Sequence, residues 1–411
     1  MENIFADRMH TVRKSFIREI LKVTEDPSII SFAGGLPNPR SFPVEEVSAA
    51  AVKVLKEDGT AALQYSTTEG YLPLREYIAG RYGRYGIKAD ASEILITTGS
   101  QQGLDLIGKV FLNKGDRVAV ERPTYLAAIQ SFGMYEPEFV DIPLQEDGID
   151  VEAMANVITG VKLLYAVPSF QNPTGITYSH EKRRQVSETL KGNDAVFVED
   201  NPYGDIRFMG EDLPPMKHYL DGDVITMGTF SKTISPGMRL GWLYASGGPA
   251  SGGIMDKLIT AKQAADLHTS YFVQRVVYRY LADNDVEKHI KYIQGLYKKQ
   301  RDAMVSAIGQ YFPEGVQYTR PEGGMFLWVT LPEGVSSMDL FDLALKQKVA
   351  FVPGQAFFVD GSGRNTLRLN YSSSDEARIE EGIRRLAGAM ERLIAEARNE
   401  AVVVKRNARH M

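Results

Sequence analysis

A lysine surrounded by hydroxyl side chains is the most chemically suggestive feature of the sequence. Lys232 lies between Ser231 and Thr233. Thr229 precedes this group, and Arg239 follows the lysine seven residues later. A lysine amine can form a Schiff base with an aldehyde, and hydroxyl groups with an arginine can bind a phosphate dianion. The segment therefore fits the anchor of pyridoxal 5′-phosphate, although a Ser-Lys-Thr turn taken alone is more often a solvated loop.

The elements that position this lysine follow a regular alternation. Between residues 93 and 246, short apolar or β-branched runs alternate with helical patterns, which predicts a mostly parallel α/β sheet. Because ligands of open α/β sheets bind beyond the carboxyl ends of the strands, the polar turns after these runs are the expected site. The predicted strands comprise residues 94–97, 117–120, 162–166, 196–198, 224–226 and 242–244.

The pattern changes from about residue 285, where a long amphipathic helix (286–309) precedes short strands at 325–329 and 366–369. A closing helix follows, with Ser374 or Asp375 as its expected N-cap, and the tail from Val402 to Met411 is predicted to be disordered. This order indicates a smaller α+β domain. The predicted parts are an N-terminal segment packing on the small domain and active site (1–45), a large cofactor-binding domain (46–285) and a small C-terminal domain (286–411).

Composition excludes several classes of function. The chain has 411 residues, 44% of them hydrophobic and 24% charged, and a net charge of −5, which argues against a nucleic-acid-binding protein. No apolar run approaches the ~20 residues that span a bilayer, and the start lacks the order of a secretory signal. With no cysteine and six scattered histidines, metal catalysis is not expected. These observations predict a cytoplasmic protein with no metal and with neither membrane nor nucleic acid as a partner.

Seven short motifs follow one another along the chain: Ser31 to Pro39, Gln64 to Ser66 with Glu69-Gly70, Thr98 to Gly103, Asn172 to Gly175, Glu199 to Tyr203, the Lys232 segment and Leu367 to Asn370. In this order they resemble the motifs of fold-type-I aminotransferases that depend on pyridoxal phosphate, and within them the 2-aminoadipate and kynurenine aminotransferase subgroup. Several motifs in the correct order are more specific than any one of them, and because they span residues 31 to 370 the resemblance covers nearly the whole chain. The resemblance implies an α/β fold with a large, mostly parallel α/β/α sheet domain and a smaller α+β domain.

The resemblance also implies roles around the cofactor ring. Lys232 would form the Schiff base and later move the substrate's α-proton, and Asp200 would contact the pyridine nitrogen. Asn172 and Tyr203 would hydrogen-bond the phenolic oxygen, and Tyr125 would stack on the ring. Each residue has an ordinary alternative as well: a surface lysine, a turn cap at Asp200 or a core tyrosine.

The phosphate and substrate contacts are implied in the same way. Backbone amides at a predicted helix start would cradle the phosphate, and a tyrosine of the partner subunit would reach it, which implies a homodimer with composite sites. The phosphate residues are Ser100, Gln101, Thr229, Ser231, Arg239 and Tyr65.

The substrate would be held mainly by Arg368, which grips the α-carboxylate, with Asn172 and Gly35 beside it. Arg18 matches a residue that contacts a distal carboxylate in aminoadipate-type members, and a solvated helix arginine is an equally plausible alternative.

The predicted function is ping-pong transfer of an amino group from an L-amino acid to a 2-oxo acid, 2-oxoglutarate being the expected acceptor. The expected donors are 2-aminoadipate, aromatic or branched amino acids, or a broad range of them. One alternative is a lyase or decarboxylase with the same cofactor. The other is a cofactor-binding transcriptional regulator, for which the roughly thirty residues before Gly34 are too few to form a DNA-binding domain.

Overall fold

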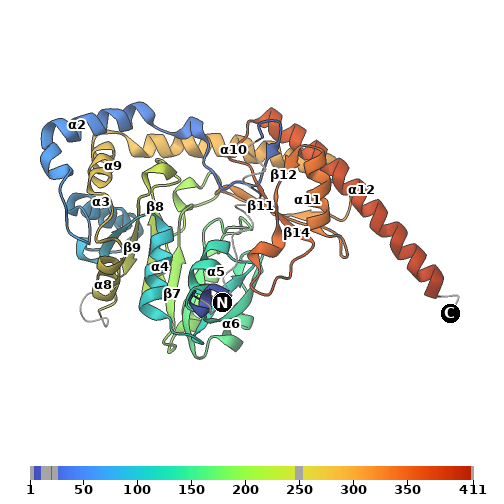
Figure 1. Cartoon of the computed structure of the whole chain (residues 1–411), viewed down its shortest axis with the longest axis horizontal. Helices are drawn as coiled ribbons and strands as arrows, with labels where there is room; N and C mark the ends of the chain where they lie inside the picture. The colour runs from blue at the N-terminus through green and yellow to red at the C-terminus, as the bar shows by residue number, and fades with distance from the viewer. Residues whose placement is uncertain (1–3, 11–19, 21–25, 246–252, 409–411) are drawn as a thin grey trace.

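The computed structural model of the chain describes residues 4–10, 20, 26–245 and 253–408. A large α/β part and a smaller part are joined by the long helix α10 (Val286–Tyr311), which crosses the top of the molecule in Figure 1. Among the described residues, no helix is long and apolar enough to cross a membrane.

The large sheet is mixed and mostly parallel, as predicted. Within the described ranges it has eight strands, and its central strands β3, β4, β6, β7 and β8 run parallel. Antiparallel pairs join β9 to β8 and β2 to β9 at one edge, and β5 to β4 at the other. The order is β2 (Ile94–Thr97), β9 (Gly241–Ala245), β8 (Val224–Thr229), β7 (Val196–Asp200), β6 (Val161–Ala166), β3 (Arg117–Arg122), β4 (Glu138–Gln145) and β5 (Gly148–Ile149).

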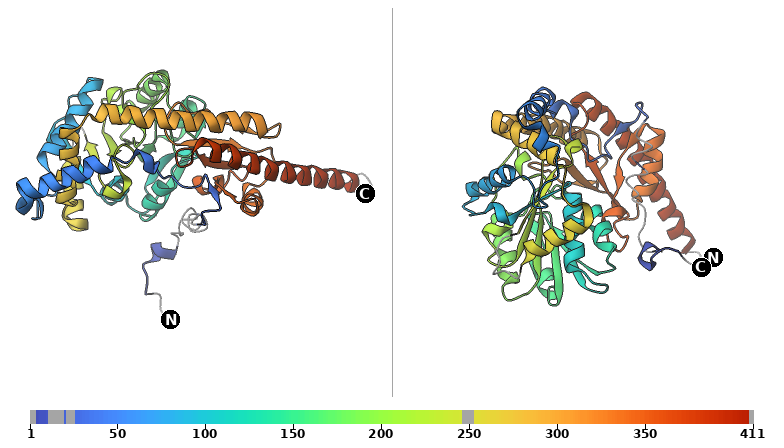
Figure 2. Two further views of the ribbon diagram at one scale, coloured as in Figure 1. Left: turned by 90° about the horizontal axis from the view of Figure 1, so that it is seen from above. Right: turned by 60° about the vertical axis from the view of Figure 1, so that its left-hand side comes forward.

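Helices cover both faces of this sheet, so its central strands are apolar on both sides (Figure 2). Alternate residues of β3 show the two faces: Val118 and Val120 belong to one core cluster and Ala119 to another. Several of these helices have a side-chain N-cap. At the start of α7, for example, the Ser179 hydroxyl accepts a hydrogen bond from the backbone amide of Lys182. The helices are α2 (Val44–Ala62), α3 (Leu72–Tyr82), α4 (Ser100–Phe111), α5 (Leu126–Gly133), α6 (Val151–Val157), α7 (His180–Leu190), α8 (Ile254–Asp266) and α9 (Tyr271–Asp283).

The small part combines an antiparallel sheet with helices α10, α11 (Ser337–Lys346) and α12 (Glu376–Ala408). Helices α10 and α12 lie side by side, as Figure 2 shows. The predicted N-cap of α12 is Asp375, whose Oδ1 accepts from the amide of Arg378 at 2.8 Å. The sheet order is β10 (Gln317–Tyr318), β11 (Phe326–Thr330), β14 (Thr366–Asn370) and β13 (Val352–Pro353).

The chain before α2 packs on the small part. Strand β1 (Ile30–Ser31) pairs in parallel with β12 (Val349–Ala350), and the carbonyl of Phe32 accepts from the amide of Asn370. The three-part domain division itself stays a prediction. Short 3₁₀ turns complete the described chain: η1 (Asp7–His10), η2 (Pro39–Ser41), η3 (Gly83–Tyr85), η4 (Ala91–Glu93), η5 (Gly204–Ile206), η6 (Met216–His218), η7 (Pro236–Met238) and η9 (Gly354–Phe357).

Several strands and the end of the chain differ from the expectations. The two-residue strands β1, β5, β10, β12 and β13 were not predicted, since they are too short to show a pattern. Strand β4 was not predicted, because its side chains are mostly exposed or half-buried and carry no continuous apolar run. The prediction of a disordered tail from Val402 is wrong, since α12 continues through Ala408. The sequence after Gly388 has no glycine or proline to stop a helix, and it is rich in alanine, glutamate and arginine, which favour one.

The docking of the N-terminal segment gives a stability prediction. Phe32 is fully buried, and its ring packs so closely on α12 that a Cβ at Gly382 would lie 2.5 Å from its Cζ. Replacing Phe32 with alanine should cost about 3–5 kcal/mol of folding free energy, because the cavity has little room to collapse. Thermal and urea unfolding would measure the loss, with the exposed Glu333→Ala as control. Equal midpoints for the two variants would contradict the packing.

Candidate active site

A cavity of about 250 Å³ opens at the carboxyl ends of the central parallel strands. Asp200 and Thr229 end β7 and β8, and Val167 follows directly after β6. This is the place where open α/β sheets bind ligands, because the strand ends present loops and helix starts to one common edge. The predicted site residues that line the cavity are Gly35, Ser100, Gln101, Tyr125, Asn172, Asp200, Tyr203, Thr229, Ser231, Lys232 and Arg239.

Lys232 lies in the turn after β8, held between two buried apolar side chains, Phe230 and Ile234. Its Nζ donates to the carbonyl oxygen of Gly35 at 3.1 Å. Burial, and then the positive charges of Arg368 and Arg239, lower the pKa of the Lys232 amine to about 8, whereas Asp200 opposes this shift. About a tenth of the amine is therefore uncharged at pH 7 and able to act as a nucleophile or a base, far more than for an ordinary lysine.

Asp200 is buried at the end of β7 and is only half satisfied. Its Oδ2 accepts from the hydroxyl of Tyr165 at 2.8 Å. Its buried Oδ1 has no hydrogen-bond partner among the described residues. Burial raises the pKa of this carboxyl to about 6, while the Tyr165 hydroxyl and the charge of Lys232 lower it. A buried carboxylate oxygen that lines a cavity and has no hydrogen-bond partner can accept a hydrogen bond from an N–H group of a ligand.

One end of the cavity is built to hold an anion. Ser100 begins α4, so the first backbone amides of that helix are free of helical partners. Gly99 precedes it with φ 71°, and a Cβ at this position would lie 2.5 Å from Nη2 of Arg239. On the same side, the Thr229 hydroxyl donates to Ser231 Oγ at 2.9 Å.

Two tyrosines and an asparagine, Tyr125, Tyr203 and Asn172, also line the cavity. Burial raises the pKa of Tyr125 to about 12 and that of Tyr203 even further, so both hydroxyls keep their protons at neutral pH. Lys232 Nζ lies 6.0 Å from the centre of the Tyr203 ring. Both tyrosines can therefore donate hydrogen bonds and offer flat ring faces.

Arg368, on strand β14 of the small part, lies behind Asn172 and is 3% exposed. Its Nη1 donates to Asn172 Oδ1 at 2.8 Å, and its Nη2 donates to the carbonyl of Ala33 at 2.8 Å. The guanidinium carbon lies 4.1 Å from the centre of the Phe326 ring. Burial lowers the pKa of Arg368 to about 10, so it still carries a positive charge, and its Nε has no partner within the described chain.

Arg368 therefore lies close to the cavity without lining it, and two further predicted residues do not join this group. Tyr65 is 79% exposed and does not line the cavity. Arg18 lies outside the described residues.

Sequence reasoning missed the residues that support the site from behind. Tyr165 holds Asp200, and Lys262 donates to Gln102 Oε1 at 2.8 Å, while the same oxygen accepts from the amide of Thr98. The only available signal was a polar side chain within a predicted strand or helix, which does not reveal its partner. Leu36, Pro37, Val167, Pro202 and Pro236 also line the cavity, and each is a near neighbour of a predicted residue.

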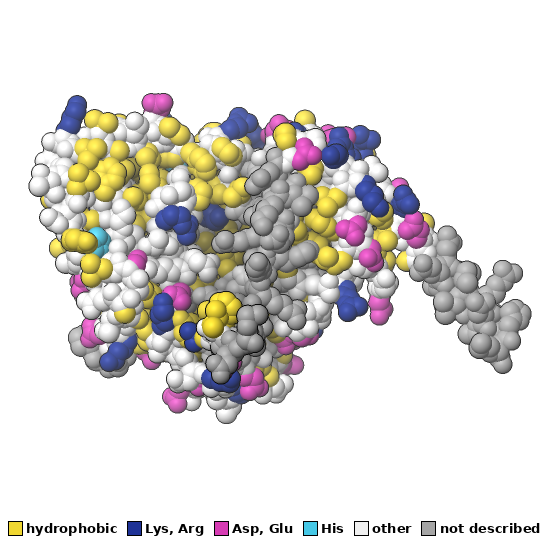
Figure 3. Space-filling view, in the orientation of Figure 1, with side chains coloured by type: hydrophobic (Ala, Val, Ile, Leu, Met, Phe, Trp, Pro, Cys, Tyr) yellow, Lys and Arg dark blue, Asp and Glu magenta, His cyan; other side chains and the backbone are white. Residues whose placement is uncertain are grey.

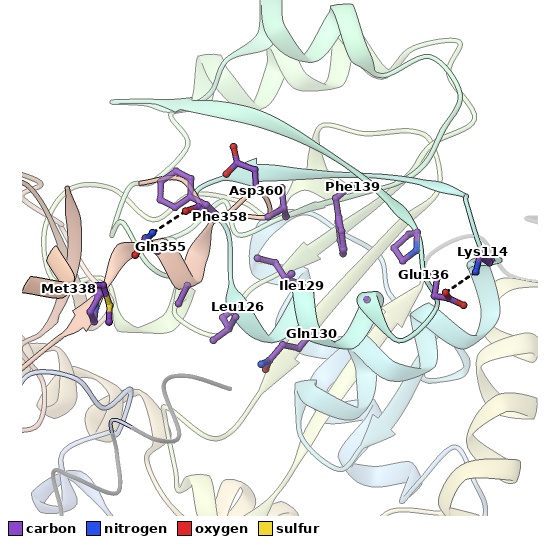
Figure 4. Close-up of a pocket in the computed structure, with 16 residues that line it drawn as sticks. Lys114, Leu126, Ile129, Gln130, Glu136, Phe139, Met338, Gln355, Phe358 and Asp360 are labelled. Carbon is purple, nitrogen blue, oxygen red and sulfur yellow. Dashed lines mark hydrogen bonds and ion pairs between the residues drawn. The ribbon is translucent and has the colours of Figure 1, made fainter. Parts of the chain in front are cut away.

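A larger groove of about 980 Å³ lies between α5 and η9, and it shares no lining residue with the cavity (Figure 4). Apolar side chains such as Ile129, Phe139 and Phe358 line it, and its Lys114 and Glu136 are paired with each other. Among the described residues, no cluster of His, Cys, Asp and Glu could hold a metal ion. The smaller cavity, which Lys232 and Asp200 line, is therefore the candidate active site.

The α/β fold and the convergence of a buried lysine, carboxylate and arginine define an enzyme that uses pyridoxal 5′-phosphate. The sequence matches the family described as aminotransferase class I and II over residues 32–386, and the chain belongs to that family. The predicted resemblance is thereby confirmed.

Known relatives cover nearly the whole chain. The aromatic-amino-acid aminotransferase 1 of Thermococcus litoralis is 44% identical over 395 residues, which cover 94% of each chain. The 2-aminoadipate transaminase of Thermus thermophilus is 44% identical over 93% of this chain and 96% of that relative. The structure of the Pyrococcus horikoshii kynurenine aminotransferase, in complex with PMP, aligns with a TM-score of 0.90 and 45% identity over 95% of this chain and 97% of that one.

The residues present fit the cofactor. The orphaned Asp200 Oδ1 matches a protonated pyridine nitrogen, and the amides of Ser100 and Gln101 with Arg239 match a phosphate. The chain is therefore a pyridoxal-phosphate-dependent aminotransferase, as predicted.

The support of Asp200 gives a prediction about pH. Replacing Tyr165 with phenylalanine removes the hydroxyl that stabilises the ionised carboxylate, so the pKa of Asp200 should rise. If the ionised form is the active one, the acidic limb of the kcat/KM–pH profile should move to higher pH by roughly half to one unit. Tyr297→Phe is the matched control, since this buried hydroxyl contacts the Asn38 amide instead. An acidic limb that stays in place in Tyr165→Phe would contradict this reasoning.

Proposed function

We propose that the protein transfers the amino group of L-amino acids with aromatic, 2-aminoadipate or other large side chains to 2-oxoglutarate. The observation that carries the proposal is that Lys232, partly uncharged near neutral pH, and Asp200 line one cavity, with Arg368 close enough for its positive charge to lower the pKa of Lys232.

Lys232 is the proposed catalytic residue. Pyridoxal phosphate, when bound, supplies an aldehyde that condenses with amines and a ring that withdraws the electron pair left when Cα loses its proton. Lys232 Nζ would hold the cofactor at its aldehyde until the substrate amine takes that place, and the freed amine would then accept the proton from the substrate Cα. Its lowered pKa suits both tasks, because a fully protonated lysine could do neither.

The remaining residues at the cavity are proposed to bind the substrate and the cofactor and to orient them. Arg368 holds the substrate α-carboxylate with the help of Asn172 and Gly35, which leaves Cα facing Lys232. Asp200 keeps a proton on the pyridine nitrogen through its unpartnered Oδ1. Asn172 and Tyr203 donate to the phenolic oxygen, and the Tyr125 ring stacks on the cofactor face. Ser100, Gln101, Thr229, Ser231 and Arg239 hold the phosphate.

Two observations support this range of amino donors: the substrates in the names of the relatives, and an exposed apolar side chain that lines the cavity. The relatives' names refer to aromatic amino acids, 2-aminoadipate and kynurenine, all with large side chains. Leu36 lines the cavity and is 59% exposed, which offers an apolar contact to such a side chain. For 2-aminoadipate and the acceptor 2-oxoglutarate, Arg18 is the proposed partner of the distal carboxylate.

Lyases and decarboxylases on this fold would use the same cofactor contacts, but their products differ. Family membership and relatives at 44% identity favour transamination over both, and over a ligand-binding regulator. The cytoplasmic location stays a prediction.

We also propose that the active unit is a homodimer in which Tyr65 of one subunit reaches the phosphate of the other. Tyr65 is exposed in the single chain, and so is Leu63 at 72%. Val44, Val52 and Leu55 on α2 are exposed as well, and Figure 3 shows apolar side chains gathered over this upper-left region. An apolar surface of this kind favours contact with a second copy of the chain.

The first prediction of the proposal concerns the half-reaction in which the amino donor passes its amino group to the cofactor. Amino donors added singly to the loaded protein, without any oxo acid, should convert the yellow absorption band of the cofactor to that of its amine form. Lys232→Ala should abolish turnover while the circular dichroism spectrum stays unchanged, and the surface variant Lys191→Ala should behave like the wild type. Near-normal turnover in Lys232→Ala, or release of ammonia or CO₂ instead of an oxo acid, would refute the proposal.

The second prediction concerns the composite site. Lys232→Ala and Tyr65→Ala homodimers should each have little activity. After the two variants are mixed and their subunits exchanged, half of the dimers should contain both changes, and each of these should have one intact site. Activity should then rise to about a quarter of the wild-type value. If Tyr65 acted within its own subunit, mixing would restore nothing.

A further inference from the structure

Glu121 and Gln171 form a buried polar pair behind the cavity, and neither lines it. Gln171 is 0% exposed and Glu121 1% exposed. Gln171 Nε2 donates to Glu121 Oε2 at 3.0 Å. The proposed function leaves both residues without a role, although polar groups buried this deeply are costly unless they are fully hydrogen-bonded.

Gln171 uses the whole hydrogen-bonding capacity of its amide. Besides the bond to Glu121, its Nε2 donates to the carbonyl of Pro123 at 2.7 Å. Its Oε1 accepts from the Thr174 amide at 2.9 Å and from the Thr174 hydroxyl at 2.6 Å. An amide offers two donors and two acceptor positions, so all four are occupied.

These bonds join two loops that each carry a residue of the cavity. Pro123 precedes Tyr125 by two residues in the loop after β3. Gln171 directly precedes Asn172, whose side chain accepts from Arg368. The single amide therefore links the loop of Tyr125 to the loop of Asn172.

The partners of Gln171 determine which way round its amide lies. Glu121 Oε1 accepts from the Tyr178 hydroxyl at 2.8 Å, while its Oε2 faces Gln171. The Pro123 carbonyl can only accept and the Thr174 backbone amide can only donate, so the Gln171 amide must present its nitrogen to Pro123 and Glu121 and its oxygen to Thr174. Burial raises the pKa of Glu121 to about 7, and the hydrogen bonds from Gln171, Tyr178 and the Val167 backbone lower it.

We propose that Gln171, oriented by Glu121, the Pro123 carbonyl and the Thr174 amide, is a positioning residue that fixes Tyr125 and Asn172 relative to each other. This inference rests on the proposed function only for the roles of Tyr125 and Asn172. The pair acts through those residues and does not itself touch substrate or cofactor.

Gln171→Glu is the direct test. It places a second carboxylate against Glu121 and removes the donor to the Pro123 carbonyl. Donors at the phenolic oxygen tune the bound cofactor, so the pH midpoint of its yellow band should move by about half a unit or more. We expect kcat to fall at least about tenfold, a difference of ~1.4 kcal/mol, with a smaller change in KM.

The double variant Glu121→Gln/Gln171→Glu distinguishes the effect on the loop of Asn172 from the effect on the loop of Tyr125. It restores one amide and one carboxylate, keeps the contacts to Thr174 and Tyr178, and leaves only the Pro123 carbonyl without a donor. The spectral midpoint, which depends on Asn172, should return toward that of the wild type. The loss of kcat should remain, because the Tyr125 loop is still released. If Gln171→Glu fails to fold, this double variant and the milder Thr174→Val still test the inference.

Gln300→Glu is the matched control. It makes the same change at a buried glutamine, which donates to the Ser374 carbonyl at 2.6 Å and does not line the cavity. It should lower the unfolding temperature without moving the spectral midpoint. If Gln171→Glu likewise lowers only the unfolding temperature, with midpoint and kcat within twofold of the wild type, the pair is structural and the inference is overturned. A shifted midpoint in a protein that reacts with no amino donor would instead refute the proposed function and leave the positioning role standing.

Discussion

The electrostatic balance around the Lys232 amine is the constraint on which the rest of the structure depends. A buried amine loses its charge easily, and two arginines push it further in that direction while one carboxylate opposes them. The same burial raises the pKa of Asp200 and lowers that of Arg368. Each shift moves a pKa toward neutral pH, and those of Lys232 and Asp200 come close enough for these two groups to gain or lose a proton at small cost.

A cavity with so many ionisable groups must be supported from behind. Tyr165 satisfies one oxygen of Asp200, and Lys262 holds the loop of Thr98 through Gln102. The pair of Glu121 and Gln171 joins the loops of Tyr125 and Asn172. Asp200 Oδ1 and Arg368 Nε are among the buried atoms that have no hydrogen-bond partner within the described chain, and both belong to charged groups at the cavity, where a ligand could supply the missing partner.

The two parts of the molecule share the site. Lys232 and Asp200 come from the large sheet, whereas Arg368 comes from β14 of the small one. The N-terminal segment bridges them, since the Gly35 carbonyl accepts from Lys232 and the Ala33 carbonyl accepts from Arg368. A shift of the small part relative to the large one would therefore change the surroundings of the lysine directly.

The sequence by itself determined the fold class, the family and most of the residues that meet in the cavity. Local signals sufficed for these, because the apolar runs of the central strands are continuous and the polar motifs follow them directly. Strand β4 lacks such a run, and the end of α12 depended on helix propensity that a polar, basic tail obscured. Tertiary structure alone decided which polar groups pair at long range. Gln171 and Glu121 are 50 residues apart, and Arg368 and Asn172 are 196 apart. Such pairings follow from the packing of whole elements, and no spacing along the chain encodes them.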